Sequence, residues 1–196
     1  MKNISVLVSG GGTNLQAVID SIESGKIPDA KIVQVISSKK DAYALTRAAD
    51  HGIEGVYIGK ENYPQMEDRT EAIIRALDEK KTDLVILAGY MSVLEPKLIE
   101  AYRNRIINIH PSLIPKYCGK GFYGHYVHEA VLAGGEKESG ATVHFVDEGV
   151  DTGKIILQKS VPVMEDDTPD TLAARVLEVE HEILPQAVCM FCEGKL

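Results

Sequence analysis

The sequence predicts a three-layer α/β fold, in which helices cover both faces of a mostly parallel sheet. Short apolar runs of strand length alternate with segments of helical spacing up to residue 110. The run at residues 84–88 is apolar throughout, which is typical of a strand that is buried on both faces. No linker, repeat or low-complexity segment interrupts the alternation. The chain has 196 residues, so we expect a single domain over residues 1–196.

The first part of the chain supplies the elements of a Rossmann-like sheet. Its helices show apolar residues at spacings of three and four, and Gly25 and Gly52 end the first two of them. Pro111 stops the last of these strands. The expected strands are 4–8, 32–36, 56–58, 84–88 and 106–110, and the expected helices are 15–22, 41–51, 68–79 and 96–102.

The last third of the chain has a different organisation. Strands expected at residues 141–146 and 155–163 are separated by a turn-rich loop, so they either pair as antiparallel strands or extend the sheet. A long helix then begins at Thr168 and Pro169, because a hydroxyl caps a helix well and proline suits its first position. We expect this helix to break or kink at Pro185.

The composition narrows the classes of protein to which the chain can belong. The formal net charge is −8 and no basic patch is visible, which argues against binding to nucleic acid. No apolar run approaches the roughly 20 residues of a membrane span, and the N-terminus lacks the features of a signal peptide. We therefore expect a cytoplasmic protein whose partners are small molecules, with no nucleic acid and no membrane.

Few side chains are spaced like metal ligands. Cys118, Cys189 and Cys192 are too few and odd in number for a disulfide framework. Cys189 and Cys192 have the spacing of a metal or redox pair but lack a second pair of ligands, so we interpret them as core or partly buried thiols. His125 and His128 lack the spacing of a zinc helix and are interpreted as surface or lid residues. We expect no metal.

A glycine-rich segment, Ser9 to Asn14, follows the first expected strand and opens the first expected helix. Glycines at such a place let backbone N–H groups approach an anion, and the helix N-terminus adds a favourable dipole. Asn14 is a natural helix cap. The segment matches neither a Walker A loop nor a full dinucleotide-binding fingerprint, and a tight turn without a ligand is the alternative. Three consecutive glycines at this position favour a phosphate site.

Asn108 and His110 lie two residues apart on the strand expected at 106–110, so their side chains project to the same face. They stand at the carboxyl end of the strand, where open α/β sheets bind ligands. An amide can stabilise an oxyanion, and an imidazole can move protons near neutral pH. The alternative is a core histidine next to an asparagine that ends the strand. The pair favours a site of acyl transfer.

The loop from Asp147 to Gly153 is acidic and contains two glycines. Calcium is the first ligand that such a loop suggests, but the EF-hand spacing is absent, and a solvated turn is the other alternative. Asp151 could orient an imidazole, raise its pKa and help to relay a proton through water. His144 precedes the loop on an expected strand, where it faces either the same cleft or the core.

Five segments of the chain match one known family in order and spacing. They are Asn108–Tyr117, Ser9–Leu15, Leu87–Met91, Val143–Val146 with Asp151, and Glu180–His181. Together they resemble the phosphoribosylglycinamide formyltransferases, a branch of the folate-dependent formyltransferase family. The set of Asn108, His110 and Asp151 is common to all branches. The glycine loop and the single-domain length narrow the resemblance to this branch.

The resemblance implies a reaction in purine biosynthesis. The amine of 5-phosphoribosylglycinamide would attack the formyl group of the co-substrate 10-formyltetrahydrofolate directly. His110 would transfer protons, Asn108 would hold the oxyanion, and Asp151 would support His110.

The resemblance also implies two binding regions. The half at residues 1–100 would bind the phosphate and substrate, and the half at residues 101–196 would bind folate and carry catalysis. Gly12, Thr13 and Asn14 would hold the phosphate, and Glu180 the ribose hydroxyls. The residues expected around folate are Met91, Ser92, Val93, Leu94, Asn108 and Asp147.

Other functions of the same residues are open at this point. Another 10-formyltetrahydrofolate-dependent formyltransferase or a hydrolase would share the catalytic set, although those enzymes are expected to carry a further domain. A non-catalytic phosphate-binding module would keep the glycine loop, but it would have no use for Asn108, His110 and Asp151 together. The protein is expected to be a monomer or a homodimer.

Overall fold

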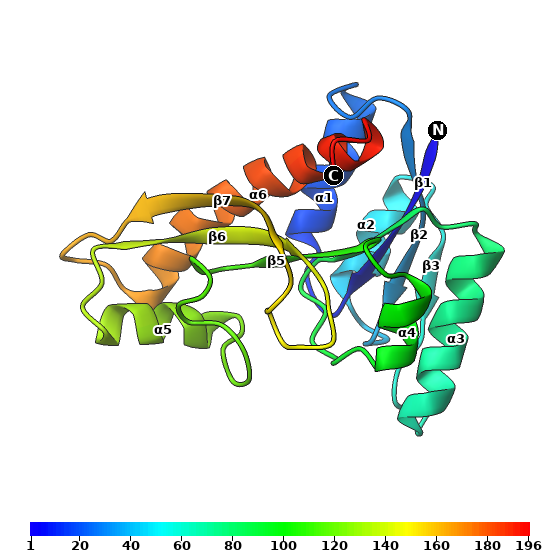
Figure 1. The fold of residues 1–196 in the computed structure, drawn as a ribbon, viewed down its shortest axis with the longest axis horizontal. Coiled ribbons are helices and arrows are strands. Elements are labelled where there is room, and N and C mark those ends of the chain that lie inside the picture. Colours follow the sequence, from blue (N-terminus) through cyan, green and yellow to red (C-terminus); the bar gives the residue numbers. More distant parts are fainter.

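The computed structural model describes all 196 residues and contains one seven-stranded sheet with helices on both faces (Figure 1). The strand order is β3-β2-β1-β4-β5-β6-β7. The strands are β1 Lys2–Val8, β2 Ala30–Ser37, β3 Gly55–Tyr57, β4 Leu84–Leu87, β5 Ile106–His110, β6 Glu138–Phe145 and β7 Ile155–Pro162. The helices are α1 Thr13–Glu23, α2 Tyr43–Asp50, α3 Met66–Glu79, α4 Pro96–Ala101, α5 His125–Ala133 and α6 Pro169–Cys192. The predicted fold class is confirmed.

The direction of the strands divides the sheet into two parts. The strands β1 to β5 run parallel to one another, whereas β6 is antiparallel to β5 and β7 is antiparallel to β6. The hairpin of β6 and β7 therefore both pairs internally and extends the sheet. Because β2 and β4 flank β1, the winding of the chain reverses at β1, which is where open α/β sheets bind ligands at their carboxyl ends.

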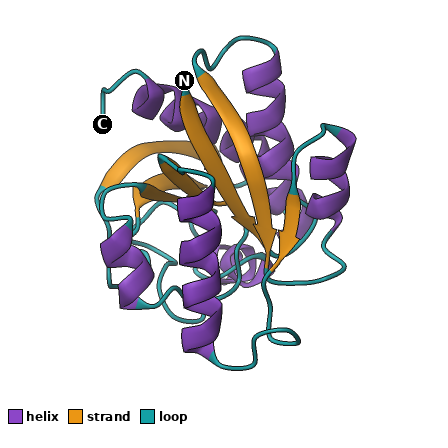
Figure 2. Cartoon of the chain, turned by 90° about the vertical axis from the view of Figure 1, so that its right-hand side faces the viewer, coloured by secondary structure: helices purple, strands orange, loops and turns teal.

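Two apolar layers enclose the sheet, as the alternation of side chains along each strand requires. Val6 of β1 lies in the larger core, with buried residues of α1, α2, α5 and α6. Leu7, the next residue, faces a smaller core built with α3 and α4. Figure 2 shows the twisted strands with helices on either side. No helix is both long enough and apolar enough to cross a membrane.

The helix α6 continues through Pro185, so of the expected break or kink the break does not occur. Thr168 caps its start as expected, because the side chain accepts a hydrogen bond from the Thr171 N–H. Proline removes one backbone donor from the helix. The buried side chains on both sides of Pro185, among them Leu184 and Val188, keep the helix packed against the larger core. Tertiary packing therefore outweighs the lost hydrogen bond.

The helix α5 was not expected from the sequence. Val127, His128 and Val131 form its inward face, while His125 is half exposed. The interpretation of His128 as a surface residue is therefore wrong, because only 4% of the residue is exposed. Glycines and tyrosines before the helix concealed its apolar spacing. Burial, followed by the charges of His125 and His110, lowers the pKa of His128 to about 4.

Candidate active site

A cavity of about 590 Å³ opens at the carboxyl ends of β4 and β5. Four chain segments supply most of its lining: the loop after β4, the end of β5, the loop 119–124 and the loop 146–151; Ile99 of α4 and His144 of β6 also line it. Its volume lies in the range of small-molecule sites, roughly 300–1,000 Å³. The lining includes every residue expected for catalysis and for folate, namely Met91, Ser92, Val93, Leu94, Asn108, His110, Asp147 and Asp151. The structure therefore brings these two sets together in one place.

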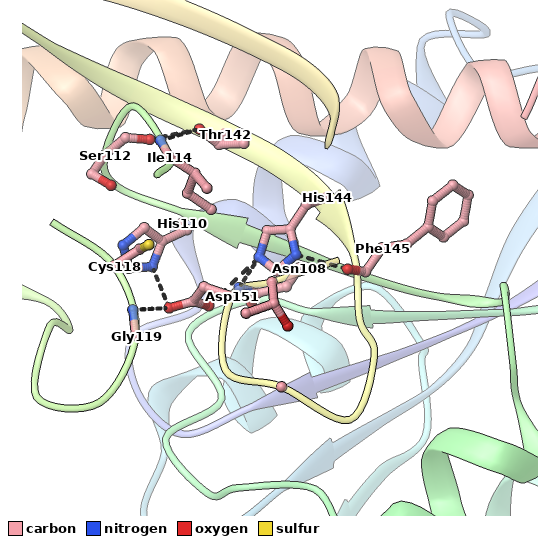
Figure 3. A network of polar contacts seen from close by, with 12 residues as sticks. Asn108, His110, Ser112, Ile114, Cys118, Gly119, Thr142, His144, Phe145 and Asp151 are labelled. Carbon is pink, nitrogen blue, oxygen red and sulfur yellow. Dashed lines mark hydrogen bonds and ion pairs between the residues drawn. The ribbon is translucent and has the colours of Figure 1, made fainter. Parts of the chain in front are cut away.

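The antiparallel pairing of β5 with β6 sets the surroundings of Asn108. The register places Asn108 opposite His144. His144 Nδ1 lies 2.8 Å from the carbonyl oxygen of Phe145 and donates to it, since a carbonyl can only accept. In neutral His144, Nε2 then accepts from the Asn108 amide nitrogen at 3.1 Å (Figure 3). The second amide hydrogen of Asn108 is left for a ligand in the cavity. His144 is thus both a core residue and a neighbour of the cleft.

The two ring nitrogens of His110 face two different acceptors. Nε2 donates to the carbonyl oxygen of Tyr117 at 2.9 Å, and Nδ1 lies 3.6 Å from Asp151 Oδ2. The second distance is beyond a hydrogen bond and within ion-pair range. Burial lowers the pKa of His110, outweighing the Tyr117 carbonyl and the Asp151 charge, which raise it. Asp151 therefore raises the pKa of the histidine as expected, but burial outweighs its effect, and His110 is neutral at neutral pH.

Asp151 is placed by a turn that cannot tolerate a larger residue at Gly153. A Cβ at Gly153 would lie 1.7 Å from the Phe145 carbonyl oxygen, so the turn lies directly against the end of β6. The Asp151 carboxylate accepts from the Gly119 N–H at 2.9 Å and lies 3.6 Å from His144 Nε2. Burial would raise the pKa of Asp151, but the interactions with His144, His110 and the Gly119 N–H lower it overall. Asp151 is therefore a carboxylate at neutral pH.

The glycine loop lies at the carboxyl end of β1, beside the cavity and outside its lining. The N-cap of α1 is Gly12, with φ +74°, and a Cβ there would lie 2.6 Å from the Cβ of Ala44. The N–H groups of the first turn of α1 are without helical acceptors, as at any helix start. The expectation that Asn14 caps the helix is wrong, because Gly12 occupies that position and Asn14 makes a tertiary contact.

The partner of Asn14 is Glu180 on α6. The Asn14 amide nitrogen donates to Glu180 Oε2 at 2.6 Å, across 166 residues of sequence. Both residues are buried, and Asn14 Oδ1 has no hydrogen-bond partner within the protein. Burial raises the pKa of Glu180 to about 7, against the lowering effect of the Asn14 hydrogen bond. A ligand with hydroxyl donors would satisfy these acceptors.

Sequence reasoning missed two residues that shape the site. Tyr117 supplies the backbone carbonyl that accepts from His110, and the identity of a side chain does not indicate which backbone carbonyl will make such a contact. Arg47 donates from Nε to the carbonyl oxygen of Gly11 at 2.8 Å, which brings a cation to the glycine loop. Its signal was visible, because Arg47 is the only arginine or lysine in the segment expected as the second helix. No group of three or more metal-ligating side chains is present.

Comparison with known proteins identifies the family of the chain. The model of the Formyl transferase family matches residues 2–188. The chain is 44% identical to phosphoribosylglycinamide formyltransferase from Haemophilus influenzae, over 100% of this chain and 90% of that protein. It is 40% identical to the enzyme of that name from Escherichia coli, over 99% of this chain and 89% of that protein. It is also 43% identical to the trifunctional purine biosynthetic protein adenosine-3 of Drosophila melanogaster, of which it covers 14%.

Solved structures extend the similarity to three dimensions. Glycinamide ribonucleotide transformylase 1 from Symbiobacterium toebii superposes with a TM-score of 0.93 at 43% identity, covering 99% of this chain and 89% of that one. The enzyme of the same name from Geobacillus kaustophilus gives a TM-score of 0.91 at 35% identity, covering 98% and 99%. The chain therefore belongs to the formyl transferase family, on its phosphoribosylglycinamide formyltransferase branch.

Proposed function

We propose that the enzyme transfers the formyl group of 10-formyltetrahydrofolate to the amine of 5-phosphoribosylglycinamide, with Asn108, His110 and Asp151 carrying the chemistry. The observation that carries the proposal is the meeting of these three residues on one wall of a 590 Å³ cavity. Acyl transfer needs a donor for the oxyanion and a group that moves protons near neutral pH. The family and its relatives support the overall reaction, and the geometry supports the roles given to these side chains.

The two ligands take adjacent regions. The pteridine of the folate occupies the cavity between residues 91–94 and the loop at Asp147, where backbone groups and apolar side chains suit a flat ring. The phosphate of the substrate lies at the glycine loop, near the N–H groups that open α1. The open acceptors of Asn14 and Glu180 receive the ribose hydroxyls. The contact of Asn14 with Glu180 joins the phosphate-binding half, residues 1–100, to the half at residues 101–196.

The reaction proceeds by direct attack. The substrate amine adds to the formyl carbon and a C–N bond forms. The carbonyl oxygen becomes an oxyanion, which accepts a hydrogen bond from the second amide N–H of Asn108. Nε2 of His110 keeps its hydrogen, which is hydrogen-bonded to the Tyr117 carbonyl oxygen. The proton of the attacking nitrogen is therefore taken by Nδ1. Asp151, 3.6 Å from Nδ1, stabilises the imidazolium that results. The proton passes on to N10 of the folate as the C–N10 bond breaks, releasing tetrahydrofolate.

A folate-product assay with different acceptors tests the proposal. Tetrahydrofolate should form with 5-phosphoribosylglycinamide and should not form with water alone or with glycinamide lacking the phosphoribosyl group. Equal rates with water would instead identify a hydrolase, and product only with another amine would identify another formyltransferase. Substitution His110→Ala should nearly abolish turnover while the circular dichroism spectrum stays unchanged. A near-normal rate in that variant would refute the assignment of proton transfer to His110.

A further inference from the structure

The carbonyl oxygen of Tyr117 determines which nitrogen of His110 is free to react. It accepts from His110 Nε2 at 2.9 Å, so the hydrogen of the neutral ring stays on Nε2. Nδ1, on the side of Asp151, is then the bare nitrogen. The position of one backbone carbonyl therefore fixes both the tautomer and the orientation of the ring. The question is what holds that carbonyl in place.

The side chain of Tyr117 is anchored at the turn between α5 and β6. Its hydroxyl donates to Glu136 Oε1 at 3.0 Å, and Lys116 Nζ lies 3.0 Å from both oxygens of the same carboxylate. The ring also packs edge-on against Phe122, with ring centroids 6.0 Å apart. These contacts surround a separate small cavity of about 260 Å³ that does not include His110.

Two backbone features show that this anchor is a close fit. Tyr117 has φ +51°, a left-handed conformation that is uncommon for an aromatic residue and has to be held by its surroundings. Gly134 lies so near the Tyr117 hydroxyl that a Cβ at this glycine would be 2.2 Å from the oxygen. The end of the phenol ring is therefore enclosed between the Gly134 backbone and the Glu136 carboxylate.

We propose that Tyr117 and Glu136 are positioning residues for His110. The hydroxyl–carboxylate contact holds Tyr117 in its left-handed conformation, which keeps its carbonyl oxygen on Nε2 and leaves Nδ1 as the proton acceptor. The inference rests on the proposed role of His110, although the tautomer itself can be measured without any reaction. Two other hydrogen bonds also hold this segment. The Ser112 hydroxyl donates to the Lys116 carbonyl oxygen, and the Gly119 N–H donates to Asp151. Those bonds are the competing explanation that the experiment has to separate.

The experiment uses enzyme labelled with ¹⁵N in its six histidines and records the long-range ¹H–¹⁵N spectrum of the imidazoles. His110 is assigned by the loss of its signals in His110→Gln. The unsubstituted enzyme should show His110 protonated on Nε2 alone. Tyr117→Phe removes the hydroxyl and keeps the ring, and Glu136→Ala removes the acceptor. Both variants should show a mixture of tautomers, and kcat should fall about 10-fold, since small misplacements of a reacting group cost up to about 100-fold.

Two further variants serve as controls. Glu136→Gln retains an oxygen that accepts from the Tyr117 hydroxyl and loses the charge opposite Lys116, so it should keep the single tautomer. Tyr126→Phe removes an exposed hydroxyl on α5 for which no hydrogen bond is present, so it should change nothing. Thermal melting checks that every variant is folded.

The results separate this inference from the proposed function. A single Nε2–H tautomer in both Tyr117→Phe and Glu136→Ala would overturn the positioning role, whatever happens to kcat. A fall in kcat without a change of tautomer would overturn it as well, because the effect would then run through another contact. An unsubstituted enzyme that shows the expected tautomer but forms no product with 5-phosphoribosylglycinamide would refute the proposed function and leave the positioning role standing.

Discussion

Glu180 should destabilise the free enzyme at alkaline pH, and the substitution Glu180→Gln should reveal by how much. Burial raises the pKa of Glu180 from its ordinary 4.5 to about 7 in the folded protein. Well below pH 4.5, Glu180 is protonated in both the folded and the unfolded state, so it then does not change the free energy of unfolding. Above that pH the unfolded chain releases its proton first, and the destabilisation grows until the folded carboxyl also ionises near pH 7. At about 1.4 kcal/mol for each pH unit, the loss is about 3 kcal/mol at about pH 8.5 and less than about 1 kcal/mol at about pH 5.

Urea denaturation of both proteins at these two pH values measures the effect. The glutamine side chain of the variant stays neutral and can still accept from the Asn14 amide, so the change in unfolding free energy should favour the variant by roughly 2 to 3 kcal/mol more at pH 8.5 than at pH 5. Comparing the two pH values cancels the direct effect of exchanging the side chain. A change in unfolding free energy that is equal at both pH values would refute a raised pKa. The variant should also bind 5-phosphoribosylglycinamide more weakly, because an ionised Glu180 is the better acceptor for ribose hydroxyls.

Three further outcomes follow from the site. Asn108→Ala should lower kcat about 100- to 1000-fold with little change in either KM, as the loss of one oxyanion donor does, and a change of less than about 3-fold would remove Asn108 from that role. Because burial lowers the pKa of His110 below 6.5, kcat/KM should fall as the pH drops through a midpoint below 6.5; a midpoint above 7 would contradict the neutral, buried histidine. Gly12→Ala forces a Cβ to within 2.6 Å of Ala44 at a positive φ, so it should destabilise the protein by about 1–3 kcal/mol and raise the KM for 5-phosphoribosylglycinamide. Gly25→Ala has a similar φ of +76° with open space around it, and it should leave that KM unchanged.

Much of the fold followed from patterns that are local in the sequence. Apolar spacing, together with capping residues, glycines and prolines at the ends of elements, located every strand and all helices except α5. The boundaries moved by a few residues, and Pro185 did not end α6. A proline removes only one hydrogen bond, whereas the apolar side chains around it keep the helix on the core. The hairpin of β6 and β7 was ambiguous because a pattern of alternation does not name the partner of a strand.

The candidate site was likewise predictable from the sequence only in part. The period of a β-strand is two residues, so the sequence alone placed Asn108 and His110 on one face, and its segments carried the resemblance to the family. The sequence could not show that Asn14 meets Glu180 rather than capping α1, since 166 residues separate them. Nor could it show that the Tyr117 carbonyl accepts from His110. Every residue has a backbone carbonyl, and only the folded structure decides which one lies against the histidine.

The sequence by itself therefore determined the alternation of strands and helices, the glycine loop at the first turn and the pair of side chains at the end of β5. Only the tertiary structure decided the partners of those groups and their protonation. The register of β5 with β6 brought His144 to Asn108, and burial lowered the pKa of His110 although a carboxylate lies beside it. The physical reason is that strand and helix periods arise from the local geometry of the backbone. Desolvation and hydrogen-bond partners arise from segments that meet only when the chain has folded.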